Sequence, residues 1–349
     1  MRCEKPLGHG DTIQGLWSAA RAQRLPHALI FSGPEGVGKF LAAQWFVFGL
    51  FCEHGPGEPC GVCGPCKRLA AGTHPDVYVL DPLAMELETI LVKHIAPRAG
   101  ESGPNLLDWF SLRPMEGGYR IAIVREAERM NHQAQNALLK TLEEPGEQAL
   151  LVLETKSPDS LLGTVRSRCS AVAFERLSLE ATGELLAREG LAGEEAARYA
   201  AWSQGAPGAA LRLHARGAGQ LVDLCGRTLD GSLDPLLAAA EVAQAKGDFG
   251  GGTARQVARE RARTFLDLAL GVLTDLGRAA AGVAPDALAH GELVASLACD
   301  HRRRNAMLEA TLQARQDIEA NLAPDAVLEE LLLSFAPATT SAGPAGGRR

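Results

Sequence analysis

The sequence has no apolar run long enough to cross a membrane. Its longest apolar stretch, Phe40–Cys52, contains Gln44 and is shorter than the ~20 residues that a bilayer span needs. The first residues, Met1–Asp11, mix charges with glycines and lack the apolar segment of a secretory signal. We therefore expect a cytoplasmic protein, in which thiols stay reduced and clustered cysteines more often bind metal than form disulfides.

The sequence also lacks a surplus of basic residues. It has 35 Lys and Arg against 42 Asp and Glu, which gives a formal net charge of −7. A protein that binds nucleic acid by itself normally carries a positive surplus, because its cations release counterions from the phosphates. Any contact with DNA is therefore expected to be local or shared with partner proteins.

No internal repeat is present, and 349 residues are enough for two or three domains. Four short apolar segments predict strands of a parallel sheet: Leu29–Ser32, Val77–Leu80, Ile121–Val124 and Leu150–Glu154. The segments between them are long enough for crossover helices. We expect an α/β domain of the P-loop type, with helices on both faces of the sheet, over residues 1–174.

Beyond about residue 175 the strand pattern gives way to helical patterns. A helical lid is predicted over residues 175–217, with helices at Leu177–Gly190, Gly193–Gln204 and Ala209–Ala215. An all-helical C-terminal domain is predicted over residues 218–335, with helices at Ala254–Ala281, Glu292–Cys299, Asn305–Asn321 and Asp325–Phe335. Residues 336–349 are rich in small residues and proline, a composition typical of a disordered tail.

A phosphate-loop motif, Gly33-Pro34-Glu35-Gly36-Val37-Gly38-Lys39, follows the first predicted strand and precedes an apolar helix. The glycines let backbone N–H groups close around phosphate oxygens, and the lysine neutralises their charge. Gly33, Gly36, Gly38 and Lys39 are therefore candidate nucleotide-binding residues, and the alternative is a plain glycine turn. The next residue, Phe40, has no hydroxyl with which to hold Mg²⁺.

Four cysteines, Cys52, Cys60, Cys63 and Cys66, lie within one short glycine- and proline-rich insertion. Their thiolates can close a tetrahedral Zn²⁺ site, and four thiolates leave no open position for a catalytic water. We expect a structural zinc ion there, and the alternative is reduced free cysteines. Three further cysteines, Cys3, Cys225 and Cys299, stand alone in the sequence.

Two segments carry a resemblance to a known family. They are Asn-Ala-Leu-Leu-Lys-Thr-Leu-Glu-Glu-Pro-Gly at 136–146 and Ser167-Arg168-Cys169. Together with the phosphate loop they resemble the AAA+ clamp-loader subunits of bacterial DNA polymerase III. The resemblance covers about residues 5–335 and is strongest over 25–75 and 117–170. It implies the AAA+ fold with a lid and a C-terminal collar, and these subunits carry a zinc module of four cysteines after the phosphate-loop helix.

The resemblance also shows what this chain lacks. Where active subunits carry Asp-Glu for magnesium and the attacking water, this chain has Arg125-Glu126, and their sensor arginine corresponds to Gly208. Together with Phe40, three positions of one ATP site are altered. The pattern resembles the non-hydrolysing, delta-prime type of subunit, which is not an enzyme by itself. The alternative is an active ATPase motor of the gamma or tau type.

By the same resemblance, Arg168 is an arginine finger that enters the ATP site of a neighbouring subunit. A planar, permanently charged guanidinium suits this role because it can bridge phosphate oxygens during transfer. The implied partners are the delta and gamma/tau subunits, with the sliding clamp and primed DNA as part of the complex.

Two further segments invite functional interpretations that we do not adopt. Thr73-His74-Pro75-Asp76 suggests a catalytic His-Asp pair, but we interpret it as a turn that enters a strand. The basic run His301–Arg304 suggests DNA contact, although such runs are more often a solvated helix face. A third class of function, a zinc-dependent nucleic-acid-binding module, is disfavoured by the negative net charge.

Overall fold

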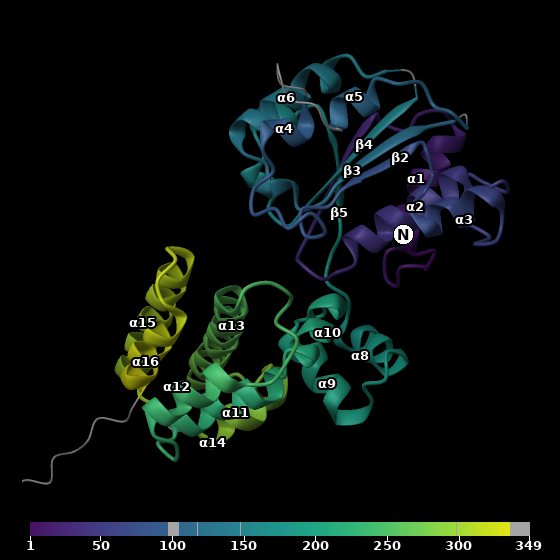
Figure 1. Ribbon diagram of the computed structural model, residues 1–349. Helices are drawn as coiled ribbons and strands as arrows, with labels where there is room; N and C mark the ends of the chain where they lie inside the picture. Colours follow the sequence, from purple (N-terminus) through teal and green to yellow (C-terminus); the bar gives the residue numbers. More distant parts are fainter. Residues whose placement is uncertain (97–104, 117, 147, 298, 336–349) are drawn as a thin grey trace, which may run out of the picture. The chain divides into compact units, whose positions relative to one another are not determined.

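The computed structural model describes residues 1–96, 105–116, 118–146, 148–297 and 299–335. The chain forms two compact units. The first contains Met1–Ala181 and Ala206–Gly208, and the second contains Thr182–Gly205 and the chain from Ala209 onward. Figure 1 shows that the strands belong to the first unit and that the second is helical. The predicted tail at 336–349 lies outside the described residues.

The first unit is built on one parallel sheet of five strands in the order β2-β3-β4-β1-β5. Its strands are β1 (Ala28–Ser32), β2 (Val77–Leu80), β3 (Arg120–Val124), β4 (Ala149–Thr155) and β5 (Ser170–Ala173). The central strands are buried on both faces, as their continuous apolar runs require. The four predicted strands and the α/β fold class are confirmed.

The fifth strand, β5, was not predicted. Its sequence Ser-Ala-Val-Ala is small and largely exposed, because β5 pairs only with β1 at the sheet edge. Edge strands bury less surface and therefore carry a weaker apolar pattern than central strands.

Helices cover both faces of the sheet (Figure 1). On one side lie α1 (Gly10–Arg21), α2 (Lys39–Phe51) and α3 (Gly64–Ala71). On the other side lie α4 (Val92–Ile95), α5 (Leu106–Phe110), α6 (His132–Glu143) and α7 (Gly163–Arg166), with short 3₁₀ turns at Ala127–Arg129 and Pro158–Ser160. Apolar side chains of α4 to α7 form one core with Ile30, Val124 and Leu153 of the sheet.

The helix after the phosphate loop is buried on nearly every side. Ala42, Phe46 and Phe48 of α2 are fully buried. Trp17 of α1 packs on α2 and donates its indole N–H to the Phe46 carbonyl oxygen at 3.0 Å. Gly49 makes this packing possible, because a Cβ atom there would lie 2.4 Å from the Trp17 ring.

The second unit consists of helices around one apolar core that includes Phe265, Leu332 and Phe335. These helices are α8 (Leu179–Arg188), α9 (Gly193–Trp202), α10 (Pro207–Ala215), α11 (Ala218–Leu229), α12 (Pro235–Gln244), α13 (Ala254–Ala280), α14 (Gly291–Ser296), α15 (His301–Glu319) and α16 (Pro324–Phe335), with a 3₁₀ turn at Pro285–Ala287. The loss of strand structure beyond residue 175 is confirmed.

Two helices of this unit, α11 and α12, were missed by the sequence analysis. Residues 218–253 were expected in the helical C-terminal domain, but no single helix was assigned there. In α11, Gly226 lies where a Cβ atom would come within 2.5 Å of Leu293. The glycine therefore permits close packing. A start signal for α12 was present, since Asp234 accepts hydrogen bonds from the N–H groups of Leu236 and Leu237.

Candidate functional site

The phosphate loop joins β1 to α2 and contains three glycines with positive φ angles. These are Gly33 at +153°, Gly36 at +81° and Gly38 at +97°. A Cβ atom on Gly33 would lie 2.1 Å from the Phe174 carbonyl oxygen, so only glycine fits beside the end of β5. The structure therefore contains the strand, glycine loop and buried helix that the motif predicted.

Lys39, the first residue of α2, is turned into the loop. Its ammonium group donates hydrogen bonds to the carbonyl oxygens of Gly33 and Pro34, each at 2.8 Å. Burial lowers the pKa of this amine, while the charge of Glu154 raises it in part. The lysine is thus placed among the loop atoms that would surround a phosphate.

Three neighbouring strands bring together charged residues at their carboxyl ends. Asp81 follows β2, Arg125 follows β3 and Glu154 lies near the end of β4. Arg125 forms an ion pair with Asp81, and its Nε atom lies 3.5 Å from Glu154 Oε2. Burial raises the pKa of Glu154, and the charge of Arg125 lowers it in part.

Arg125 also stacks on Phe40. The centre of its guanidinium lies 4.0 Å from the centroid of the Phe40 ring, within the range of a cation–π contact. Phe40 and Arg125, the two residues expected from the sequence to stand at magnesium-ligand positions, therefore contact each other in the structure. The sequence analysis named Phe40 and Arg125 separately and missed their contact, as well as the roles of Asp81 and Glu154.

Glu126, which follows Arg125, has a positive φ of +46° and forms an ion pair with Arg129. Its carboxylate is engaged in a local contact across one turn. The third altered position, Gly208, is the second residue of α10 and has no side chain to offer.

The four predicted zinc ligands converge. The Sγ atoms of Cys52, Cys60, Cys63 and Cys66 all lie within 4.8 Å of one another. A tetrahedral Zn²⁺ with Zn–S bonds of about 2.3 Å separates its thiolates by roughly 3.8 Å. The donor set and its compactness therefore fit one zinc ion.

Backbone N–H groups support these sulfurs. The N–H of Cys60 donates to Cys52 Sγ and the N–H of Cys63 donates to Cys60 Sγ, both at 3.4 Å. Hydrogen bonds from the backbone at Val62 and Cys63 lower the pKa of the Cys60 thiol to about 6. Burial raises the pKa of the Cys66 thiol.

A fifth cysteine lies beside the cluster. Cys3 Sγ is 3.6 Å from the position that a Gly61 Cβ atom would take. Burial is the main cause that raises the pKa of the Cys3 thiol, and the nearby thiols of Cys60 and Cys52 raise it further. The description of Cys3 as isolated was wrong, because sequence separation hid a contact made by the N-terminal segment.

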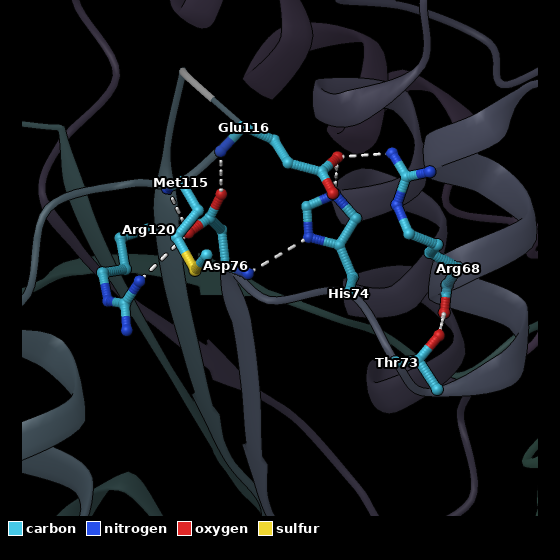
Figure 2. A network of polar contacts seen from close by, with 7 residues as sticks. All are labelled: Arg68, Thr73, His74, Asp76, Met115, Glu116 and Arg120. Carbon is cyan, nitrogen blue, oxygen red and sulfur yellow. Dashed lines mark hydrogen bonds and ion pairs between the residues drawn. The ribbon is translucent and has the colours of Figure 1, made fainter.

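The turn at Thr73–Asp76 contains a buried polar network (Figure 2). Asp76 is fully buried, and its carboxylate accepts the N–H groups of Met115 and Glu116 and pairs with Arg120 at 3.0 Å. His74 accepts the N–H of Asp76 at 3.2 Å. The interpretation as a turn that enters β2 is confirmed, since the His74 carbonyl oxygen accepts the Val77 N–H.

The same network reaches the cysteine module. Arg68, on α3, pairs with Glu116 at 2.5 Å, and His74 Nε2 lies 3.4 Å from the same carboxylate oxygen (Figure 2). Because α3 begins next to Cys63 and contains Cys66, the network ties this module to β2 and β3.

Arg168 lies between α7 and β5. Its Nη2 donates to Glu143 Oε1 at 2.6 Å and its Nη1 donates to the Thr164 carbonyl oxygen at 2.9 Å. Glu143 belongs to the 136–146 segment, so the two most informative sequence segments are in contact. The neighbouring Cys169 is half-buried, and burial raises the pKa of its thiol to about 11.

One arginine of the basic run at the start of α15 has a structural role. Arg303 donates to the carbonyl oxygens of Leu229 at 3.0 Å and Phe335 at 2.6 Å, near the ends of α11 and α16. Asp300 caps α15 by accepting the N–H groups of Arg302 and Arg303.

Comparison with known proteins finds similarity to one family over about half of the chain. The family described as "DNA polymerase III, delta subunit" matches residues 8–178. DNA polymerase III subunit delta' of Pseudomonas aeruginosa is 38% identical over 211 residues, and that of Bacillus subtilis is 32% identical over 171 residues. This part of the chain therefore resembles DNA polymerase III delta-prime subunits. These alignments cover 58% and 49% of this chain, and 61% and 49% of the relatives.

A subunit of a different type is also similar to this chain. DNA polymerase III subunit tau of Bacillus subtilis is 32% identical over 181 residues, which is 52% of this chain and 30% of that protein. A solved gamma subunit-related protein from Thermotoga maritima aligns over 92% of this chain and 98% of its own, at 17% identity and a TM-score of 0.46. In the described part of the chain, no helix is both long enough and apolar enough to span a bilayer.

Proposed function

We propose that this chain is a non-hydrolysing delta-prime subunit of the DNA polymerase III clamp loader. In this role it assembles with the delta and gamma/tau subunits and takes part in loading the sliding clamp onto primed DNA. Similarity to delta-prime subunits supports the assembly, and the contact between Phe40 and Arg125 supports the absence of hydrolysis. That contact is the observation that carries the proposal.

The physical reason for the absence of hydrolysis is charge. Phosphoryl transfer in P-loop enzymes needs Mg²⁺ held by a hydroxyl and a carboxylate. Here an arginine, stacked on Phe40 and paired with Asp81, stands at the end of β3 where the carboxylate is required. A fixed cation at that place repels a divalent ion, and Asp81 and Glu154 are engaged in neutralising Arg125.

The catalytic contribution of this subunit lies at a neighbour's site. Arg168 acts there as an arginine finger, since a guanidinium stabilises the charge that develops on the transferred phosphoryl group. It is partly exposed, with 34% of its side chain accessible, as a residue that must reach another protein requires. The zinc site of Cys52, Cys60, Cys63 and Cys66 is structural in this proposal, and it stabilises the module next to α2 and β2.

An active motor of the gamma or tau type is the alternative, and the similarity to tau subunits is the observation that favours it. Titration of a fluorescent ATP analogue with and without Mg²⁺, followed by turnover measurements, separates the two functions. We expect no Mg²⁺-dependent turnover by the isolated chain. Turnover on the order of 1 per second would establish the motor function instead.

Variants sharpen this test. Phe40→Thr alone should not restore turnover, because Arg125 remains at the metal position. Phe40→Thr combined with Arg125→Asp should make nucleotide binding depend on Mg²⁺, since it restores a hydroxyl and a carboxylate. Turnover should stay low because Gly208 supplies no cation.

Lys39→Ala in the double variant is the matched control, since it removes the phosphate-binding ammonium group and leaves the restored ligands in place. If the double variant bound nucleotide with no dependence on Mg²⁺, the role assigned to Phe40 and Arg125 would be refuted.

A further inference from the structure

The contact between Arg168 and Glu143 pairs two charges and also constrains the position of the Arg168 guanidinium. Exposed ion pairs contribute little to folding stability, and the Glu143 side chain is 51% accessible. Stability therefore does not explain the contact well. Its other effect is to fix where the guanidinium lies.

Two acceptors hold the Arg168 guanidinium at two different nitrogens. Glu143 Oε1 accepts from Nη2 at 2.6 Å, and the Thr164 carbonyl oxygen accepts from Nη1 at 2.9 Å. A guanidinium has five N–H donors, so donors are left over with which to bind an anion. The two acceptors hold the fork and leave it able to contact a phosphate.

The elements that supply these acceptors are themselves joined. Gln135 of α6 is buried, accepts the Leu162 N–H at 2.7 Å and donates to the Ser160 carbonyl oxygen at 3.3 Å. The segment that leads into α7 is therefore bound to α6, whose last residue is Glu143. Glu143 thus lies on a rigid support, as a residue that orients another side chain requires.

We propose that Glu143 is a positioning residue for Arg168. It holds the guanidinium in the orientation in which the finger meets a phosphoryl group of the neighbouring subunit, and it does not touch the nucleotide. This inference rests on the proposed function of Arg168 as a finger. The neighbouring Glu144 is the C-cap residue of α6 and forms no ion pair with Arg168 in the described structure. Of these two adjacent carboxylates, Glu143 is therefore the one to which we assign the role.

The test uses the assembled clamp-loader complex and its ATPase activity in the presence of clamp and primed DNA. Glu143→Ala should lower kcat and leave KM unchanged, because misplacement of a catalytic group by about 1 Å costs on the order of 10²-fold at the affected site. Several sites act in one complex, so the bulk activity should fall between that of wild type and that of Arg168→Ala. Glu143→Gln should recover part of the loss, since its amide oxygen still accepts a hydrogen bond.

Two controls match this change. Glu144→Ala removes the adjacent carboxylate, and Asp159→Ala breaks the nearby ion pair between Asp159 and Arg166. Both should keep wild-type kcat. The double variant Glu143→Ala/Arg168→Ala should be no slower than Arg168→Ala alone, because Glu143 acts only through Arg168.

The outcomes separate the inference from the function on which it rests. Wild-type ATPase with Arg168→Ala would refute the finger itself. A slow Arg168→Ala complex with an unchanged or faster Glu143→Ala complex would refute positioning and keep the finger. A double variant slower than Arg168→Ala would show that Glu143 acts by another route and would also refute the inference.

Discussion

At the scale of single residues, Phe40 and Arg125 fit together at one site because their side chains contact each other. Phe40 offers the face of its ring to the Arg125 guanidinium at 4.0 Å, and Asp81 neutralises the same cation. Together they form a packed contact that stands where the motif would bind a metal ion.

The buried network around Asp76 allows a prediction at this scale. Asp76→Ala should lower the free energy of unfolding by about 3–5 kcal/mol, because it leaves the buried Arg120 without its partner. The N–H groups of Met115 and Glu116 would also lose their acceptor. Urea unfolding followed by circular dichroism measures this.

Lys5→Ala is the control, since Lys5 and Glu58 form an exposed pair that should contribute less than about 1 kcal/mol. An Asp76→Ala protein as stable as the control would show that the network does not hold the turn.

At the scale of elements, the cysteine module is attached to the sheet on one side and to the N-terminal segment on the other. Arg68 of α3 forms an ion pair with the Glu116 carboxylate, and the Glu116 backbone N–H donates to the Asp76 carboxylate. The Met1 ammonium group donates to the Ala70 carbonyl oxygen at 3.2 Å, and Lys5 pairs with Glu58. The module is therefore integrated with the first unit.

The metal prediction belongs to this module. The purified protein should contain about one Zn²⁺ per chain, and Cys63→Ser should lower that content while the sheet remains folded. Elemental analysis of protein purified without chelator, with its thiols reduced, measures the metal. Cys299→Ser is the control, because Cys299 belongs to the second unit. A metal-free wild-type protein under these conditions would disprove the site.

At the scale of the whole molecule, the second unit contains a buried contact between His290 and Asp275, on which a side chain of the lid packs. His290 donates to Asp275 through its backbone N–H at 3.0 Å and contacts it through Nδ1 at 2.9 Å. The Trp202 ring of α9 stacks on His290 with centroids 5.6 Å apart. Arg278 also approaches Asp275, at 3.5 Å.

This pair predicts a dependence of stability on pH. Burial lowers the pKa of His290, and the hydrogen bond that His290 makes to the Asp275 carboxylate offsets this only in part. The unfolded chain, with a histidine pKa of about 6.5, therefore binds more protons than the folded chain, and stability rises with pH. The contribution is complete above about pH 6.5 and is lost as the pH falls below that value through the folded pKa.

Thermal unfolding between about pH 8 and pH 5.5 tests this, around the reference histidine pKa. The midpoint of the wild type should fall more steeply than that of His290→Gln. Burial also lowers the pKa values of His9 and His74, so a weaker slope should remain in the variant. Equal slopes in the two proteins would contradict the role of His290.

The sequence by itself determined the elements whose signals are local. Short apolar runs predicted four of the five strands, glycine spacing predicted the phosphate loop, and cysteine spacing predicted the cluster. It did not identify β5, α11 or α12. β5 is a short, exposed edge strand of small residues, and the packing of Gly226 against Leu293 in α11 becomes visible only in three dimensions, while the start signal of α12 at Asp234 was overlooked.

Only the tertiary structure decided which of the named residues meet. The contacts between Phe40 and Arg125, between Glu143 and Arg168, and between Cys3 and the four-cysteine cluster all join residues that are separated in the chain. The parallel order of β2, β3 and β4 places Asp81, Arg125 and Glu154 side by side at the carboxyl ends of these strands. Local propensity acts over a few residues, whereas these contacts depend on how the strands and helices pack, and that packing determines which charges become neighbours.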